Sequence, residues 1–342
     1  MSSTFSGNTA SGGANAGGSI FNASSGQLTV SNSTFINNTA DNQGGGIHNE
    51  DTLIVSNSTL FGNSAPSGGG ISTLASGTAT LRNTIVGGST SGGNCAGVIA
   101  VGSTNNMATD NTCGSSFAQV TAAQLNFGAL TGSPAYLPLN PGSVAIDAGD
   151  NVSCTLADQR GVPRPQDGDD ADSVAVCDIG AYEATFADLR ASKVNNVGGV
   201  AVLSVPFTWT ATISNTGVEP AAFAAGQVIF RDHLPAGASY GTPVAQNPVN
   251  VTNASNIACS IASNVLTCTA GSATVTLGAA TGKFEVAFSA TPTATGSLVN
   301  PTGGPCRADP DGGIAESEES NNDCANTVTV TARVHLPLVL KQ

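Results

Sequence analysis

The sequence predicts an all-β protein in which a parallel β-helix precedes an antiparallel β-sandwich. Three observations lead to this prediction: the first 90 residues repeat, the second half alternates between apolar and polar residues, and turn-forming residues are abundant. Only 10% of the 342 residues are charged, whereas 42 are glycine. Disordered chains usually combine high net charge with few β-branched residues, but Val, Ile and Thr recur here at strand-like spacing. We therefore expect ordered strands joined by many turns.

Three short elements recur in the first 90 residues, and the first of them returns after 30 residues and then after 25. A Ser/Thr-rich element, a glycine cluster that ends in Ile, and an alternating apolar element follow one another in each unit. They are Ser3–Ala10, Ser33–Ala40 and Ser58–Ala65; Gly17–Ile20, Gly44–Ile47 and Gly68–Ile71; and Gln27–Asn32, Thr52–Asn57 and Thr78–Asn83. One such unit cannot bury its apolar side alone, so stacking at about 4.8 Å per layer predicts a right-handed parallel β-helix.

Asparagines fall at one equivalent position of the three repeats. Asn32, Asn57 and Asn83 each end the alternating element, so we expect their amides to form a ladder of hydrogen bonds along the helix and to cap a turn. The glycine clusters suit positive φ or close backbone approach. A ligand groove lined by these residues is the alternative. The first coil begins at Met1 without a cap, and an uncovered coil is an aggregation hazard, so we expect further coils or a partner upstream.

The net charge of −13 argues against nucleic acid and anionic membranes as partners. No apolar run approaches the roughly 20 residues of a membrane span. No signal peptide precedes the repeats, so we expect that a targeting segment has been removed.

Eight cysteines form four close pairs along the sequence, none with the CxxC spacing of a zinc or redox motif. The pairs are Cys95 with Cys113, Cys154 with Cys177, Cys259 with Cys268, and Cys306 with Cys324. An even count in a chain of this composition predicts disulfides and an oxidising compartment. Many connectivities are open, and pairing of neighbours is the simplest.

Charged residues suggest two further kinds of site. The mixed set Asp147, Asp158, Arg160, Arg164 and Asp178 predicts an ion-pair network that closes the end of the β-helix, with Cys154 and Cys177 clamping it; a binding site is the alternative. Two acidic loops offer the oxygen ligands that calcium prefers, and solvated loops are the alternative reading. Their acids are Asp167, Asp169, Asp170 and Asp172, and Asp309, Asp311, Glu316, Glu318 and Glu319, the latter in a loop that Cys306 and Cys324 would close. Calcium is the only cofactor that the sequence suggests.

A catalytic site is not predicted. Enzymatic β-helices need clustered carboxylates and a basic residue on one outer strand face. The first 100 residues contain only Asp41, Glu50, Asp51 and Arg82 as charged residues, with His48 beside them.

The repeats resemble those of polymorphic outer-membrane proteins, since Gly44-Gly-Gly-Ile47 and Phe35-Ile-Asn-Asn38 match the GGA[IL]-like and FxxN-like signatures of that family. The stretch that follows resembles the choice-of-anchor module that ends many bacterial surface β-helices. Its matching segments are Leu137–Gly149, Asp158–Pro165 and Cys177–Glu183, and an acidic insertion at 166–175 departs from the pattern.

The second half resembles the Ig-like repeat of bacterial surface proteins through Phe207–Gly217 and Phe230–Gly237, and cell-adhesion-related domains through Asp309–Asn322. The resemblance implies an immunoglobulin-like sandwich with an adhesion, stalk or matrix role. Alternating segments from the residues alone agree with a sandwich: 202–205, 208–213, 227–230, 265–269, 274–277 and 283–289. Trp209 is expected in the core, with a sugar-binding platform as the alternative.

The expected domains are β-helix repeats at 1–90, a disulfide-stapled module that ends the helix at 91–183, the Ig-like sandwich at 184–334 and an apolar tail at 335–342. The tail suits a last strand, a sorting signal or a segment inserted into a neighbour's sheet.

The function that these observations predict is a non-catalytic, extracellular structural or adhesive protein of the bacterial cell surface. Its expected partners are further copies, joined into a fibre through the open first coil or the tail, or cell-surface and matrix components. A processed passenger of a longer secreted chain is compatible with this role. A carbohydrate-binding or carbohydrate-cleaving β-helix is the alternative.

Overall fold

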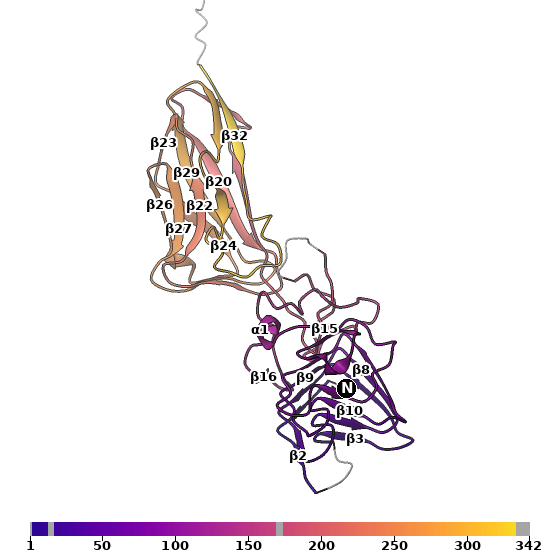
Figure 1. Ribbon diagram of the computed structural model, residues 1–342. Coiled ribbons are helices and arrows are strands. Elements are labelled where there is room, and N and C mark those ends of the chain that lie inside the picture. The colour runs from indigo at the N-terminus through magenta and orange to yellow at the C-terminus, as the bar shows by residue number, and fades with distance from the viewer. Residues whose placement is uncertain (1, 13–16, 169–173, 333–342) are drawn as a thin grey trace, which may run out of the picture. The chain divides into compact units, whose positions relative to one another are not determined.

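The structure is a computed structural model that describes residues 2–12, 17–168 and 174–332. The chain divides into two compact units, and their boundary falls between Thr185 and Phe186. Figure 1 shows coils of short strands in the first unit and long strands in the second. None of the helices in the described ranges is long and apolar enough to cross a membrane.

The first unit is a parallel β-helix, as predicted, with three main sheets whose neighbouring strands come from successive coils. The first sheet has the order β1 (Ser3–Ser6), β5 (Ser33–Ile36), β9 (Thr59–Phe61), β12 (Ile85–Gly87), β14 (Asn106–Ala108) and β15 (Phe117–Gln119). The second has β3 (Ile20–Asn22), β7 (Ile47–Asn49), β10 (Ile71–Thr73) and β13 (Cys95–Ala96), and the third β4 (Gln27–Ser31), β8 (Thr52–Ser56) and β11 (Thr78–Arg82). A short pair joins β2 (Thr9–Ala10) to β6 (Thr39–Ala40).

Equivalent apolar residues stack along the interior of the helix because the strand register matches the sequence repeat. Phe35 pairs with Leu60 in the first sheet, and Leu53 pairs with Ala79 in the third. All four side chains are fully buried. The repeat that is visible in the sequence is therefore the register of the sheets.

The two ends of this interior differ. At the far end the disulfide between Cys95 and Cys113 and the ring of Phe117 fill the interior, and each of these residues is at most 4% exposed. At the near end the first coil, β1 to β4, leaves Phe5, Ile20 and Leu28 only partly buried, although Val30 is 6% exposed.

Residues after the last coil return along the outside of the first sheet. They include α1 (Ala122–Leu125) and the hairpin of β16 (Thr131–Gly132) and β17 (Ala135–Tyr136). Phe127 packs edge-on against Phe61 of β9, with ring centroids 5.1 Å apart. Residues 147–168 and 174–183, here called the clamp segment, continue this outer layer.

The second unit is an immunoglobulin-like sandwich of mainly antiparallel strands. One sheet has the order β18 (Leu189–Asn195), β20 (Phe207–Asn215), β29 (Lys283–Pro292) and β23 (Ala238–Tyr240), and β24 (Val244–Val249) also pairs with β29. A second has β26 (Ile257–Ala262), β27 (Val265–Ala270), β22 (Val228–His233) and β31 (Cys306–Ala308). Smaller sheets join β19 (Val200–Val202), β32 (Asn326–Thr331) and β30 (Gly296–Asn300), and β21 (Ala221–Phe223), β28 (Val275–Leu277) and β25 (Val251–Thr252).

Aromatic rings fill the core of the sandwich. The ring of Trp209 lies in contact with those of Phe207, Tyr240 and Phe288, and its side chain is fully buried. Its position in the core is the one predicted, because β20 alternates strictly between buried and half-buried residues.

Candidate functional site

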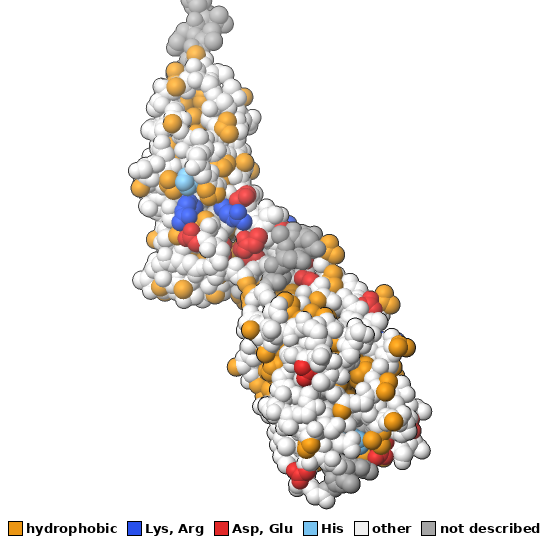
Figure 2. Space-filling model, viewed as in Figure 1, with side chains coloured by type: hydrophobic (Ala, Val, Ile, Leu, Met, Phe, Trp, Pro, Cys, Tyr) orange, Lys and Arg blue, Asp and Glu red, His pale blue; other side chains and the backbone are white. Residues whose placement is uncertain are grey.

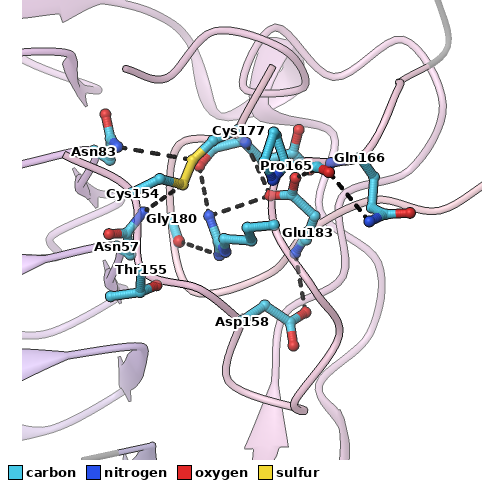
Figure 3. A network of polar contacts seen from close by, with 12 residues as sticks. Asn57, Asn83, Cys154, Thr155, Asp158, Pro165, Gln166, Cys177, Gly180 and Glu183 are labelled. Atoms are coloured by element: carbon cyan, nitrogen blue, oxygen red, sulfur yellow. Dashed lines mark hydrogen bonds and ion pairs between the residues drawn. A yellow bond between two sulfur atoms is a disulfide. The ribbon is translucent and has the colours of Figure 1, made fainter. Parts of the chain in front are cut away.

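Arg164 belongs to a polar network of the clamp segment, and Figure 3 shows its partners Gly180 and Glu183. Its guanidinium donates hydrogen bonds to the backbone oxygens of Asp178 (2.8 Å) and Gly180 (2.9 Å) and forms an ion pair of 3.2 Å with Glu183. The side chains of Arg164 and Glu183 are both fully buried. The hydrogen bonds around it stabilise a buried charge pair of this kind, and loss of one partner leaves the other as an uncompensated buried charge.

Asp158 and Arg160 extend this network. The Asp158 carboxylate accepts hydrogen bonds from Nε of Arg160 (2.8 Å) and from the backbone N–H of Glu183 (3.1 Å). The Arg160 guanidinium also lies 3.8 Å above the ring of Tyr182, which adds a cation–π contact. Two arginines thus fix the fold of a segment that has almost no regular secondary structure.

Burial shapes the protonation of the acids in this network. Burial raises the pKa of Asp178 well above its ordinary value, and the neighbouring Glu183 carboxylate raises it further. Burial also raises the pKa of Glu183, while Arg164 acts in the opposite direction. Asp178 accepts the backbone N–H groups of Asp147 and Ala184. The structure therefore brings together all five residues of the predicted mixed-charge set and adds Glu183, which that set did not include.

The expected position of this network at the end of the β-helix is corrected by the structure. The clamp segment lies along the side of the coils, because Gln159 bonds to Thr4 and Thr34, and the backbone N–H of Ala181 donates to Thr59. These threonines belong to β1, β5 and β9, so one segment contacts three successive coils. The disulfide Cys154–Cys177 lies within it.

Asn32, Asn57 and Asn83 face the clamp segment rather than one another. All three have φ near +46° (47°, 45° and 46°), the left-handed region in which Asn is tolerated. The amide nitrogen of Asn32 contacts the backbone oxygen of Ala157, and that of Asn83 contacts the backbone oxygen of Asp150. The amide nitrogen of Asn57 contacts the sulfur of Cys154. The amide ladder predicted at these positions is corrected: these residues turn the chain and anchor the clamp.

An amide ladder does exist at another position of the repeat. Nδ2 of Asn8 donates to Asn38 (2.8 Å), and Nδ2 of Asn38 donates to Asn63 (2.8 Å). A second ladder joins Asn22 to Asn49. The FxxN-like signature contains Asn38, so the signal for this ladder was present in the sequence.

The first coil presents an apolar edge. A hollow of about 60 Å³ is lined by Phe5, Ile20 and Leu28, together with neighbouring residues of the first two coils. The residues that follow them in the stack, Phe35 and Ile47, are fully buried. Phe5 and Phe35 stack with ring centroids 4.6 Å apart, so the edge continues the interior of the helix to its surface.

The acids of the 309–319 loop have separate partners. Asp309 accepts backbone N–H groups of Gly313 and Ile314, and Glu316 accepts those of Leu189 and the Asn322 amide. The remaining acids point to other groups: Asp311 to Arg231, Glu318 to the backbone of Ser320, and Glu319 to Arg307.

Across the described ranges, no group of three or more His, Cys, Asp or Glu is placed to hold a metal ion. The calcium hypothesis gains no support from the 309–319 loop. Of the other acidic loop, Asp167 is described, whereas Asp169, Asp170 and Asp172 lie outside the described residues.

His48 is buried rather than facing solvent. Its side chain is fully buried in β7, where the ring stacks on Phe21 at 5.5 Å, and its nearest carboxylate oxygen is that of Glu50 at 3.9 Å. Burial lowers the pKa of His48 below its ordinary value, although Glu50 acts in the opposite direction.

The four disulfides join neighbouring cysteines, the simplest of the pairings that the sequence left open. Cys259 and Cys268 face one another directly across the β26–β27 hairpin. Cys306, which begins β31, is bonded to Cys324, and the backbone N–H of Cys324 also donates to the backbone oxygen of Cys306 at 2.7 Å. This disulfide closes the 309–319 loop, as the sequence suggested. Both cysteines are buried, with Cys324 7% exposed, so the base of the loop is part of the sandwich core.

Charged side chains are sparse on the surface of the second unit. In the view of Figure 2 they gather near one end of the sandwich. Two of the ion pairs on this unit join the strands of the second sheet to the 309–319 loop, through Arg231 to Asp311 and Arg307 to Glu319.

Three polar residues inside the sandwich were missed by the sequence analysis. Lys193, Asp232 and Asn300 are 6%, 0% and 1% exposed. The signal was the alternation of β18, where Lys193 occupies the same face as the buried residues Leu189 and Ala191.

Comparison with known proteins gives one match by family. The family model described as the Chlamydia polymorphic membrane protein repeat matches residues 32–50. No curated protein matches the sequence. The matched residues run from the clamp-facing Asn32 to the glycine cluster of the second coil. With the β-helical fold and the disulfides, this match supports a bacterial surface β-helix repeat protein.

Among solved structures, the chain is similar to the CARDB domain of a Pyrococcus furiosus protein in complex with di-metal ions (16% identity, 44% of this chain and 100% of that chain, TM-score 0.28). It is also similar to a cohesin module from a Clostridium perfringens family 33 glycoside hydrolase (12% identity, 44% and 100%, TM-score 0.27). Both scores are low, so the fold of the second unit is defined by its sheet topology.

Proposed function

We propose that the chain is a non-catalytic structural component of a bacterial cell surface, in which the β-helix is a rigid spacer that pairs with a second copy through its first coil. The observation that carries this proposal is the difference in burial between equivalent side chains of the first and second coils. Phe35 is fully buried, whereas Phe5, which precedes it in the same stack, lines an open hollow. An exposed coil edge also presents unpaired backbone N–H and C=O groups, which are a template for another strand.

The shape of the edge favours another coil of the same kind as its occupant. Three strand edges and the apolar side chains between them must be covered together, and a coil of the same repeat has the matching spacing. The far end of the helix is a poor candidate, because Cys95, Cys113 and Phe117 close its interior. For the chain as given, the first coil of a second copy is the coil that we propose as partner, in a contact that is the same on both sides.

A pair of this kind is closed, so it does not by itself extend into a fibre. Growth into a fibre would need a second contact elsewhere on the chain. The tail at 335–342, which the sequence suggested for this role, lies outside the described residues.

The test measures self-association of the full chain. We expect the molar mass from sedimentation equilibrium to rise from monomer to dimer with concentration, and Phe5→Glu and Leu28→Glu to remain monomeric. Val101→Glu is the matched control, because Val101 lies in the same unit, is fully exposed and falls between β13 and β14, several coils away from the first. A wild-type chain that stays monomeric at every concentration, or edge variants that dimerise as the control does, would contradict the proposal.

The carbohydrate alternative has weaker support. Sugar-binding surfaces use rows of exposed aromatic rings, and Phe21 is the one aromatic side chain in the exposed class among the described residues. Its ring stacks on the buried His48, which gives it a structural partner.

A further inference from the structure

Lys193, Asp232 and Asn300 meet inside the sandwich although they come from three different strands. Lys193 is in β18, Asp232 is in β22 and Asn300 ends β30. The Lys193 amine bonds to Oδ2 of Asp232 in an ion pair with both side chains fully buried. The Asn300 amide nitrogen lies 3.5 Å from the same carboxylate oxygen. Amine, carboxylate and carboxamide therefore share one enclosed site.

Aromatic rings surround this site and exclude water from it. Nζ of Lys193 lies 4.7 Å from the ring centre of Trp209 and 5.0 Å from that of Phe288. Burial lowers the pKa of Lys193 to about 8 and raises the pKa of Asp232. Both shifts favour the transfer of a proton from the amine to the carboxylate, and a desolvated neutral lysine is a good nucleophile.

Two oxygen atoms of the site have no hydrogen-bond partner within the described part of the chain. They are Oδ1 of Asp232 and Oδ1 of Asn300. Buried polar atoms are almost always satisfied, and an exception needs an explanation. A proton on Oδ1 of Asp232 makes that oxygen a donor instead of an unpaired acceptor. The site is therefore incomplete as an ordinary ion pair and suited to a reaction between its own groups.

We propose that Lys193 and Asn300 are joined by an amide bond between Nζ and Cγ, formed inside the folded second unit with Asp232 carrying the protons. This inference is independent of the pairing proposed above, because it concerns a covalent modification within one copy.

The reaction needs no external reactant. Lys193 passes one proton to the Asp232 carboxylate, and the neutral amine attacks Cγ of Asn300, so that a C–N bond forms and an electron pair moves onto Oδ1. The Asp232 acid then protonates Nδ2 and takes up a second proton from Nζ. The carbonyl re-forms, the bond from Cγ to Nδ2 breaks, and ammonia leaves with that second proton as ammonium. The carboxylate of Asp232 is regenerated.

Asn300 is a better electrophile in this site than Asp232. Ammonia leaves from the protonated Nδ2 of Asn300, whereas the acid form of Asp232 would have to expel hydroxide, a poorer leaving group. The usual loss of ammonia from asparagine, by attack of the next backbone nitrogen, is blocked here because Pro301 has no N–H. Loss of ammonia at Asn300 therefore reports attack by another nucleophile.

Mass spectrometry of the full chain tests the proposal. After reduction and alkylation of the cysteines, we expect the intact wild-type chain to be lighter than its sequence mass by one ammonia. A protease digest should contain a branched peptide that joins Lys193 to Asn300. A wild-type chain at its full sequence mass would overturn the proposal, and so would the loss of one water, which would place the bond at Asp232.

Three variants and one control locate the reaction. Lys193→Met, Asn300→Ser and Asp232→Asn should each keep the full mass expected from sequence. Lys283→Met changes an exposed lysine in the same unit and should still lose ammonia. Retention of the ammonia loss in Lys193→Met or Asn300→Ser would overturn the bond, and its retention in Asp232→Asn would overturn the role of the acid. If a variant fails to fold, the wild-type digest decides alone.

Discussion

The two units of this protein bury polar groups in different ways. In the β-helix, asparagines lie at repeating positions and bond to their counterparts in neighbouring coils, as in the ladder from Asn8 to Asn38 and Asn63. In the sandwich, three polar side chains are concentrated in one site, with Lys193 against Asp232. The repeat places like side chains against one another, whereas the sandwich brings an amine, a carboxylate and a carboxamide together in one site.

The single tryptophan makes the two units separable in experiments. Trp209 lies in the core of the sandwich, so its fluorescence reports unfolding of the second unit. Far-UV circular dichroism reports both units. A variant that weakens only the first unit should therefore change the circular dichroism signal without changing the fluorescence.

The largest effect is expected from Arg164→Met, which removes the only buried cation near Asp178 and Glu183 among the described residues of the clamp. Because both carboxyls stay buried, the first unit should lose about 3–5 kcal/mol of unfolding free energy. Urea unfolding followed by circular dichroism measures this loss, and the midpoint from Trp209 fluorescence should not move. Arg82→Met is the control: Arg82 is exposed, so we expect a change within about 0.5 kcal/mol. A loss as small as that of the control would show that the clamp does not depend on Arg164.

An intermediate effect is expected from Asn63→Ala in the amide ladder. Asn63 accepts the backbone N–H and the amide of Asn38, and the variant leaves that backbone N–H unpaired, while the amide keeps its bond to the backbone oxygen of Phe5. The first unit should lose about 1–3 kcal/mol, measured by the same urea titration. Asn8→Ala, at the exposed end of the ladder, should cost less than half as much. Equal losses at the two positions would contradict the idea that burial gives the ladder its strength.

A pH-dependent effect on the stability of the second unit is expected from Glu316. Burial raises the pKa of Glu316 from 4.5 to about 8, and hydrogen bonds from Leu189 and Asn322 offset part of this effect. A folded pKa above the unfolded value means that the contribution of Glu316 is fully present below pH 4.5 and is lost as the pH rises to about 8.

Fluorescence-monitored urea unfolding of wild type and Glu316→Gln at several pH values measures this effect. The wild-type unfolding free energy should fall relative to that of the variant between pH 4.5 and about 8. Parallel profiles for the two proteins would show that Glu316 ionises normally.

The sequence repeat of the first unit predicted more of its strands than the alternation of apolar and polar residues predicted in the second unit. Equivalent positions such as Leu53 and Ala79 pair in register, because a stacked coil has few ways to align identical units. In the sandwich, the expected segments 208–213 and 265–269 lie within β20 and β27. The strands β18, β24, β26, β30 and β32 were not predicted, because their patterns include charged or small residues that also suit loops.

For the candidate sites, too, the sequence indicated some of the residues but not where the fold places them. The mixed-charge set of the clamp was visible from its density of charge, but its position along the side of the coils was not, since that depends on where a chain without regular secondary structure returns. Lys193 and Asn300 are 107 residues apart in the sequence. Whether these two residues lie close together depends on how two sheets pack against each other, and local sequence patterns do not predict that packing.

The clamp segment changes how the β-helix can come apart. A stack of repeats in which each contacts only its neighbours can fray from one end, coil by coil. Here one stretch of chain is bonded to Thr4, Thr34 and Thr59 at once, and to Asn83 at the turn before the next coil. Losing an outer coil therefore loosens the segment that holds the inner ones. The first three coils are therefore expected to unfold together, and the first unit should melt as a single cooperative block rather than as a sequence of steps.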